Sequence, residues 1–326
     1  MNGKKTMLKH SDCYYCKPGG YLFNSYTVEE HSISTRMMIG ERHEGWPGIP
    51  HGGVGMTAFV ELCDMLDEGK SGFPVIYSFR FGGEQIAVGD EVEISVNSSK
   101  PEYRGKMATP GTVMPYLKAS MKNGMLDQRD YVQSRTVSMR VSMRYAQHTL
   151  RIPDMSYRLL FKRGSNQQRN MRSFYFHEYS KGYTMLYCRS RDMLGEAGRS
   201  FNTLRGDQVH PGVLITLLDE TMGWAGFLSA WQGGVTVILD VNLFKPVSAD
   251  DSFIICGMCN SISGSAQRKL VHVTGAVFTE LDEGYELSGY ARGKWLTLPG
   301  YKEKMTRYLL GSEDVEGFST RFPGLT

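Results

Sequence analysis

The chain has 326 residues, of which 41% are hydrophobic and 22% are charged, as is ordinary for a globular protein. Its formal net charge of +3 at pH 7 is small for this length, so the sequence lacks the basic excess typical of nucleic-acid binding. No apolar run approaches the ~20 residues that cross a bilayer, and the N-terminus lacks the apolar segment of a secretory signal. We expect a cytoplasmic protein of two domains with no nucleic-acid or membrane partner.

Six cysteines include two pairs with C-x-x-C spacing, Cys13/Cys16 and Cys256/Cys259. A structural zinc ion would require both pairs at one tetrahedral site. The second pair lies in SFIICGMC, which has the pattern of a strand, and residues three apart on a strand point to opposite faces. We therefore expect buried thiols and no metal.

The first half has the pattern of one helix among several strands. SISTRMMIG (32–40) alternates like a strand, and WPGIPHGGVGMTAFVELCDML (46–66) contains a loop that ends at His51 and leads into an apolar helical stretch. Residues 74–96 alternate on both sides of a turn, as a hairpin does. YVQSRTVSMRVSM (131–143) alternates again and predicts a further strand.

The second half repeats this plan after a basic, polar stretch at 158–172. YTMLYCRSRD (183–192) predicts the leading strand, DQVHPGVLITLLDETMGWAG (207–226) the loop and helix, and 235–256 the hairpin. His210 follows His51 by 159 positions, so the two halves are copies of one unit.

A single helix per antiparallel sheet must bury its apolar face on that sheet, which predicts an α+β fold for each unit. We expect an N-terminal domain at 1–155, a linker at 156–172, a C-terminal domain at 173–300 and a C-terminal tail at 301–326.

The motifs resemble those of the hot-dog superfamily. HEGWPGIPHGG (43–53) is similar to the H-x-G-x-P-G-x-x-H-G-G loop of PaaI-like thioesterases, and His210-Pro211-Gly212 with the run Leu217-Leu218-Asp219-Glu220 forms the second match. The opening Cys13-Tyr-Tyr-Cys16 is similar to one found in some relatives.

This resemblance implies two tandem hot-dog domains, each a long central helix wrapped by an antiparallel sheet, that pair as a pseudo-dimer with continuous sheets. It also implies an acyl-CoA or acyl-thioester thioesterase with sites at the seam between the units. No cofactor is implied beyond the CoA of the substrate, and a homodimer of the tandem chain is compatible with the family's packing.

Thioester hydrolysis needs a group that polarises the carbonyl and a carboxylate that activates water or attacks directly. Backbone N–H groups at a helix start can hold the oxyanion, so Gly53 and Gly212 are the expected donors. Pro211 has no N–H, which makes the first loop the better oxyanion site. Asp219 lies nine residues after His210, where the family has its catalytic acid, and we expect it to act with Gly53.

The first copy has Val60 at the position of Asp219. The nearest acids are Glu61 and Asp64, which could serve only if the helix were shifted; otherwise this half keeps a binding or structural role. The remaining motif residues, His51, Gly52, His210 and Glu220, are candidates for substrate binding. The main role expected for the two histidines is to shape their turns.

Two other functions compete with hydrolysis. GDQVHPGVL (206–214) is similar to the loop of hot-dog β-hydroxyacyl dehydratases, but residues 201–205 lack their upstream histidine and the acid comes two positions late. A non-catalytic acyl-thioester binder is the third candidate. Trp46, Trp224 and Trp231 could line an acyl pocket or fill the core. The basic stretch at 158–172 could meet the phosphates of CoA.

Overall fold

The computed structural model describes residues 13–17, 19–67, 72–125, 129–146, 148–153, 156–161, 171–180, 182–194 and 200–309. In the first half the elements are β1 (Thr27–Val28), β2 (Ser32–Met38), the 3₁₀ helix η2 (Glu41–His43), α1 (Gly52–Leu66), β3 (Val75–Phe81), β4 (Glu91–Ser99), β5 (Glu102–Ala108), β6 (Leu117–Asn123) and α2 (Arg129–Met143).

The elements of the second half are β7 (His148–Pro153), α3 (Tyr157–Leu160), β8 (Met171–Ser180), β9 (Tyr183–Arg189), α4 (Ser190–Leu194), β10 (Thr203–Arg205), β11 (Gln208–Val209), α5 (Pro211–Ala230), β12 (Gly234–Leu243), β13 (Phe253–Gly264), β14 (Lys269–Leu281), β15 (Gly284–Thr297) and α6 (Tyr301–Leu309).

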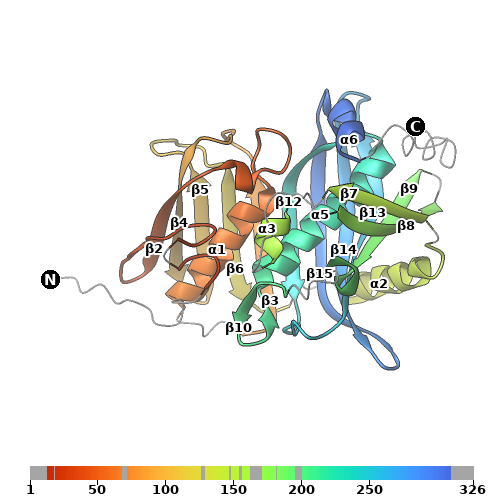
Figure 1. The fold of residues 1–326 in the computed structure, drawn as a ribbon, viewed down its shortest axis with the longest axis horizontal. Coiled ribbons are helices and arrows are strands. Elements are labelled where there is room, and N and C mark those ends of the chain that lie inside the picture. The colour runs from red at the N-terminus through yellow and green to blue at the C-terminus, as the bar shows by residue number, and fades with distance from the viewer. Residues whose placement is uncertain are drawn as a thin grey trace.

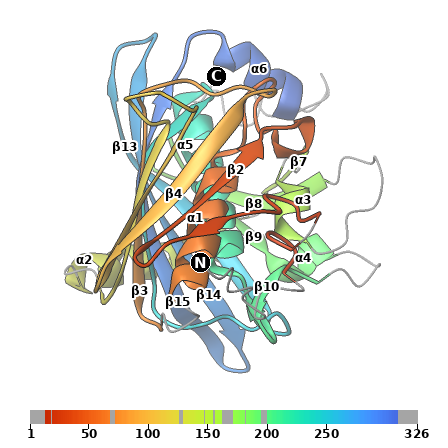
Figure 2. The same ribbon diagram turned by 90° about the vertical axis from the view of Figure 1, so that its left-hand side faces the viewer.

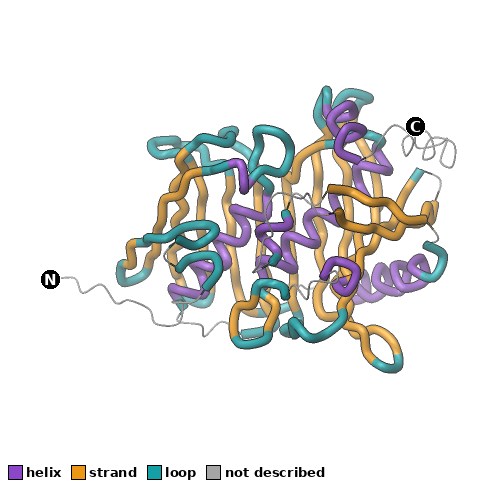
Figure 3. The backbone as a smooth tube through the Cα atoms, in the orientation of Figure 1, coloured by secondary structure: helices purple, strands orange, loops and turns teal. Residues whose placement is uncertain are grey.

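One antiparallel sheet of 13 strands runs through the described part of the chain, in the order β1-β2-β4-β5-β6-β3-β12-β15-β14-β13-β9-β8-β7 (Figures 1 and 3). Read outward from the junction of β3 and β12, the strands β3-β6-β5-β4-β2 and β12-β15-β14-β13-β9 follow the same sequence-order pattern. Each set of five wraps one long helix, α1 or α5. The chain therefore has a double hot-dog fold, as its sequence motifs predict.

The two central helices lie side by side on the same face of the sheet (Figure 1). Both are apolar around nearly their whole circumference, and both are buried over nearly their whole length, as such helices must be. The end of the sheet formed by β7 to β9 curls around α5, so this helix is enclosed on two sides (Figure 2).

The two units join along the pair β3 and β12, whose antiparallel register sets Phe79 opposite Leu239. At this junction Arg80 Nη1 lies 2.7 Å from Asp240 Oδ1, an ion pair between residues 160 positions apart in the chain. The sheets are therefore continuous between the units, as the resemblance implies.

The helix pair has a reciprocal close contact. A β-carbon on Gly53 would lie 2.4 Å from Thr216 Oγ1, and one on Gly212 would lie 2.7 Å from the Thr57 side chain. Both glycines and both threonines are related by the 159-residue offset of the repeat. A larger residue at either glycine would push the helices apart, so these positions are used for packing.

The strand predicted at 131–143 is wrong, because this segment is the helix α2. Alternation in its second half suggested a strand, yet Val137 and Val141 are 53% and 47% exposed while Met139 and Met143 are buried. The helix lays its methionines on the outer face of the sheet in a small separate core with Tyr187 (Figure 2). The buried spacing of four is helical.

The segment between the units adds strands to the second sheet. β7 pairs with β8 beyond β9, so residues 148–153 lie at the far edge on the side of the second unit. The expected linker at 156–172 contains α3 and the beginning of β8, while residues 162–170 lie outside the described residues. α6 begins the expected tail and packs near β7. The domain boundaries themselves stay a prediction.

Cys256 belongs to the core under α2 and Cys259 to the core around α5, so this pair does point to opposite faces of β13. Among the described residues no helix is long and apolar enough to span a membrane.

Candidate active site

The loop before each central helix is closed by its histidine. His51 Nδ1 accepts a hydrogen bond of 2.9 Å from the Gly53 N–H, and His210 Nδ1 accepts one of 3.0 Å from the Gly212 N–H. Both histidines are therefore helix N-caps, and a neutral ring with an accepting Nδ1 carries its proton on Nε2. The His51 N–H in turn donates to the His43 carbonyl at 2.8 Å, which fixes the loop.

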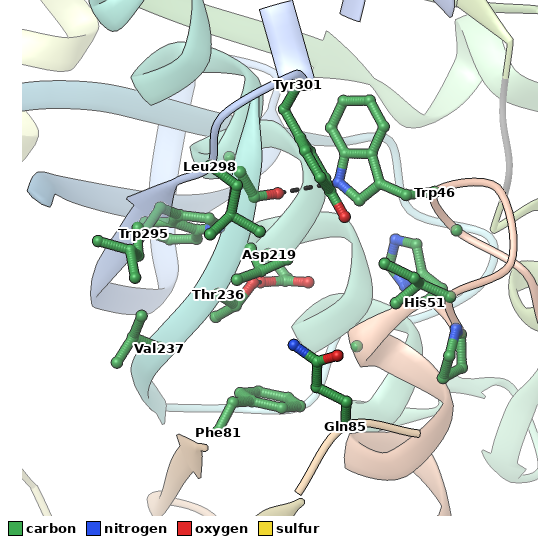
Figure 4. A pocket seen from close by; sticks show the side chains of 18 of the residues that line it. Trp46, His51, Phe81, Gln85, Asp219, Thr236, Val237, Trp295, Leu298 and Tyr301 are labelled. Carbon is green, nitrogen blue, oxygen red and sulfur yellow. Dashed lines mark hydrogen bonds between the residues drawn. The ribbon is translucent and has the colours of Figure 1, made fainter. Parts of the chain in front are cut away.

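A cavity of about 1020 Å³ opens at the seam, beside the beginning of α1 (Figure 4). Its wall combines the loop at 45–52 and the loop at 81–87 of the first unit with α5, the start of β12 and the end of β15 of the second. Because each unit contributes one side, the cavity exists only in the paired arrangement.

Aromatic side chains form much of this wall. The ring of Trp46 lies 6.2 Å from that of Trp224, 6.0 Å from Phe227 and 5.1 Å from Tyr301. Its indole N–H donates to the Gly234 carbonyl at 2.9 Å, which ties the first unit's loop to β12. The result is a wide apolar chamber with few polar groups, a typical small-molecule site.

Asp219 is one of three acidic residues that line this cavity, with Glu84 and Glu220. It is 6% exposed, and burial raises its pKa above the usual range of aspartate, while His51 and a hydrogen bond from Thr236 act in the opposite direction. The Thr236 hydroxyl donates to Asp219 Oδ1 at 2.7 Å. The other oxygen, Oδ2, faces the first residue of α1, because a β-carbon on Gly52 would lie 3.3 Å from it.

The Gly53 N–H, which the sequence predicts as the oxyanion donor, already donates a hydrogen bond to His51 Nδ1. Gly52 is the first residue of α1, where a backbone N–H has no carbonyl partner within the helix. It lines the cavity beside Asp219, and the missing side chain lets a substrate carbonyl approach.

The equivalent seam on the other side is closed. Its cavity is only about 20 Å³, room for about one water molecule, and is lined by Val60, Asp64 and Pro211 among others. Pro211 stands where the first loop has Gly52 and supplies no N–H. This seam therefore lacks the space of the open one and its first helix N–H, and it has Val60 in place of Asp219.

Four other expected site residues lie away from the open cavity. Glu61 is fully buried and bonded to His210, whose side chain is also fully buried, so neither can meet a substrate. Asp64 borders the closed seam, and Gly212 packs on Thr57 with its N–H used by His210. Packing of the two helices, which the motif does not encode, separates them from the site.

Glu220 lines the open cavity, but its carboxylate is already paired. Its Oε2 lies 2.8 Å from Arg172 Nη1 and accepts a 2.8 Å hydrogen bond from the Ser156 hydroxyl. The Arg172 side chain is fully buried, so this member of the basic stretch faces the interior and cannot meet CoA phosphates in solvent.

Several cavity residues escaped the sequence pattern. Trp46 and Trp224 line the cavity as considered, while Trp231 caps the end of α5 in a left-handed conformation and does not. Thr236, Gln85 and Tyr301 had no sequence signal, because they lie in a strand, in a loop and at the first residue of α6, where the direction of the side chain depends on packing. Figure 4 shows the Gln85 amide turned into the cavity.

No protein-family model matches the sequence, and no curated protein matches it significantly. Several solved structures of low sequence identity are similar to the chain. A putative thioesterase from Novosphingobium aromaticivorans is 13% identical, with 85% of this chain and 100% of that chain covered and a TM-score of 0.48. An acyl-CoA thioesterase II from Mycobacterium marinum is 12% identical, with 85% of this chain and 97% of that chain covered and a TM-score of 0.48.

The dehydratase domain of PpsC from Mycobacterium tuberculosis, solved with C12:1-CoA, is 11% identical. The match covers 84% of this chain and 97% of that chain, with a TM-score of 0.47. A fold does not by itself determine a function, so the chemistry of this chain must be argued from its own side chains. The PaaI-like branch stays a prediction.

Proposed function

We propose that the chain hydrolyses an acyl thioester, with acyl-CoA as the substrate class, at the open seam. The observation that carries this proposal is the position of Asp219 Oδ2 beside Gly52, at the beginning of α1. A carboxylate and an unpaired helix N–H from opposite units then face one chamber. These are the two elements that thioester hydrolysis needs.

In this reaction the Gly52 N–H, aided by the positive end of α1, holds the thioester carbonyl oxygen as negative charge develops on it. Asp219 takes a proton from a water molecule whose oxygen attacks the carbonyl carbon. The tetrahedral intermediate collapses with cleavage of the C–S bond, and the proton leaves with the thiolate as free thiol. Thr236 fixes the carboxylate through Oδ1 and leaves Oδ2 for the water.

The wall of the cavity suits an apolar acyl group of substantial width, because Trp46, Trp224 and Phe227 supply broad ring surfaces. Arg268, which is exposed and comes from the turn between β13 and β14, borders the cavity. A guanidinium in this position can contact the phosphates of CoA while the acyl group occupies the interior.

Dehydration of a β-hydroxyacyl thioester is the second candidate, because His51 and Asp219 line the same chamber. Against it, Nδ1 of His51 is used as the N-cap, so the neutral ring offers only a protonated Nε2. The second unit also has no histidine at the position of His43 in the repeat. The residue there is Asn202, which is fully buried and donates a hydrogen bond to the Tyr15 hydroxyl.

The test is a thiol-release assay with saturated, aromatic and β-hydroxyacyl-CoAs, read beside absorbance for enoyl-CoA formation. Free CoA with no enoyl product, lost in Asp219→Asn and kept in Asp64→Asn, is the expected result. Enoyl product from β-hydroxyacyl-CoA would replace hydrolysis by dehydration. Binding of acyl-CoA without turnover in the wild type would make the protein a binder.

A further inference from the structure

The N-terminal C-x-x-C turn folds onto α1 at Glu61, and neither its two cysteines nor Glu61 lines the proposed catalytic chamber. Cys13 Sγ and Cys16 Sγ each lie 2.8 Å from Glu61 Oε1. The ligand atoms of these three residues all lie within 4.8 Å of one another. The Tyr15 N–H points at Cys13 Sγ, 3.4 Å away.

We propose that Cys13, Cys16 and Glu61 form a zinc site that fastens the N-terminal turn to the junction of the two units. Two thiolates select a soft or borderline metal, and the added carboxylate favours zinc over copper(I). Tetrahedral bonds of these ligands separate sulfur from oxygen by ~3.5 Å, so a small outward shift of the two sulfurs accommodates the ion.

The second oxygen of Glu61 is positioned for this role by His210. Nδ1 of His210 accepts from the Gly212 N–H, so Nε2 carries the proton and donates to Glu61 Oε2 at 2.9 Å. Oε2 is thereby occupied and Oε1 is left toward the sulfurs. Hydrogen bonds of this kind commonly orient a metal-binding carboxylate. His210 is then a positioning residue, and the three ligands leave one position for water.

The repeat supplies an internal comparison. Glu220 is the counterpart of Glu61, and a guanidinium, that of Arg172, lies 2.8 Å from it. At Glu61 the corresponding place is taken by the two thiols of Cys13 and Cys16.

The turn is also anchored to the second unit, so the ion would hold three parts of the chain together. The Tyr15 ring stacks edge-on against His210 with centroids 4.8 Å apart, and its hydroxyl donates to the Leu159 carbonyl at 2.6 Å. On binding, two S–Zn bonds and one O–Zn bond form and the two thiol protons go to solvent.

The experiment uses the full chain without a histidine tag, purified under reducing conditions. We expect one zinc per chain by inductively coupled plasma mass spectrometry. Zinc-edge absorption spectroscopy should show two sulfur ligands at ~2.3 Å with oxygen or nitrogen at ~2.0–2.2 Å. Cobalt exchanged into the site should give a sulfur-to-metal charge-transfer band. These measurements need no variant, so they hold even if variants fold poorly.

Cys13→Ser and Cys16→Ser should each lose the zinc. The control is Cys63→Ala, which removes a thiol from the helix that carries Glu61 and should keep the zinc. A wild-type protein that binds no zinc after dialysis against it would overturn the proposal. So would a metal bound only through oxygen and nitrogen, zinc retained in both serine variants, or a Cys13–Cys16 disulfide found by mass spectrometry. Thiol release is measured separately, so failure of either proposal leaves the other standing.

Discussion

Thr236 donates a 2.7 Å hydrogen bond to Asp219 Oδ1 from the start of β12, beside an irregularity in its pairing with β15. The register shift between Thr236 and Ile238 turns successive residues of this strand toward the cavity, so Val235, Thr236 and Val237 all line it. The irregularity thus places a hydroxyl where it fixes a buried carboxylate.

Asp219→Asn should lower kcat for thiol release by at least ~10²-fold, since the amide cannot take a proton from water. Its free energy of unfolding at neutral pH should equal or exceed that of the wild type. Burial raises the pKa of folded Asp219 above its unfolded value, so ionisation costs stability as the pH rises through that interval. Urea unfolding checks this, and a less stable Asn variant would contradict it.

Activity should rise with pH through a pKa above the usual range of aspartate, because the carboxylate is the active form. The Thr236 hydrogen bond lowers that pKa, so Thr236→Val should move the acidic limb of kcat/KM to higher pH. Thr221→Val, at a buried threonine that does not line the cavity, is the matched control. An unmoved limb in Thr236→Val would show that another group titrates.

Gly52→Pro should fold and should lower kcat by about 10²–10³-fold, since it removes the proposed oxyanion N–H. Proline is well accepted at the first helical position, and His51 already has the extended conformation that precedes proline. Gly52→Ala adds a β-carbon 3.3 Å from Asp219 Oδ2 but keeps the N–H, so it separates crowding from loss of the donor. Equal activity in the two variants would exclude Gly52 as the donor.

Gly53→Ala should destabilise the protein by about 1–3 kcal/mol, because its β-carbon would lie 2.4 Å from Thr216 Oγ1 and force the helices apart. Gly40→Ala, whose β-carbon would meet nothing within 4 Å, should change stability little. Urea unfolding measures both. Adding Thr216→Ala to Gly53→Ala should recover part of the loss, and no recovery would place the strain elsewhere.

Arg268→Ala should raise KM for acyl-CoA by roughly two- to fivefold, the effect of losing an exposed ion pair. The thioester of the same acid with N-acetylcysteamine, which has no phosphates, should be unaffected. Arg191→Ala, at an exposed arginine outside the cavity wall, is the control. A similar change with both thioesters would assign Arg268 to the shape of the cavity instead.

The duplication, the two central helices and the α+β architecture followed from local pattern. The segments that begin at His51 and His210 are long, apolar and preceded by the same loop, and such helices have few alternatives to burial on a sheet. The prediction of a strand at 131–143 was wrong. Four apolar residues that alternate with polar ones at the end of this segment fit a strand as well as a helix, and only packing on the outer face of the sheet decides between them.

The sequence by itself also determined that Asp219 has no counterpart at Val60 and that Pro211 lacks the N–H that Gly52 has, because these facts depend on residue identity alone. Only the tertiary structure decided which glycine N–H is free, since the capping hydrogen bond to Gly53 depends on the orientation of the His51 ring. It also brought Cys13 and Cys16 to Glu61, more than forty positions away in the chain. Contacts at that separation depend on how the helices and the N-terminal turn pack, which no local pattern encodes.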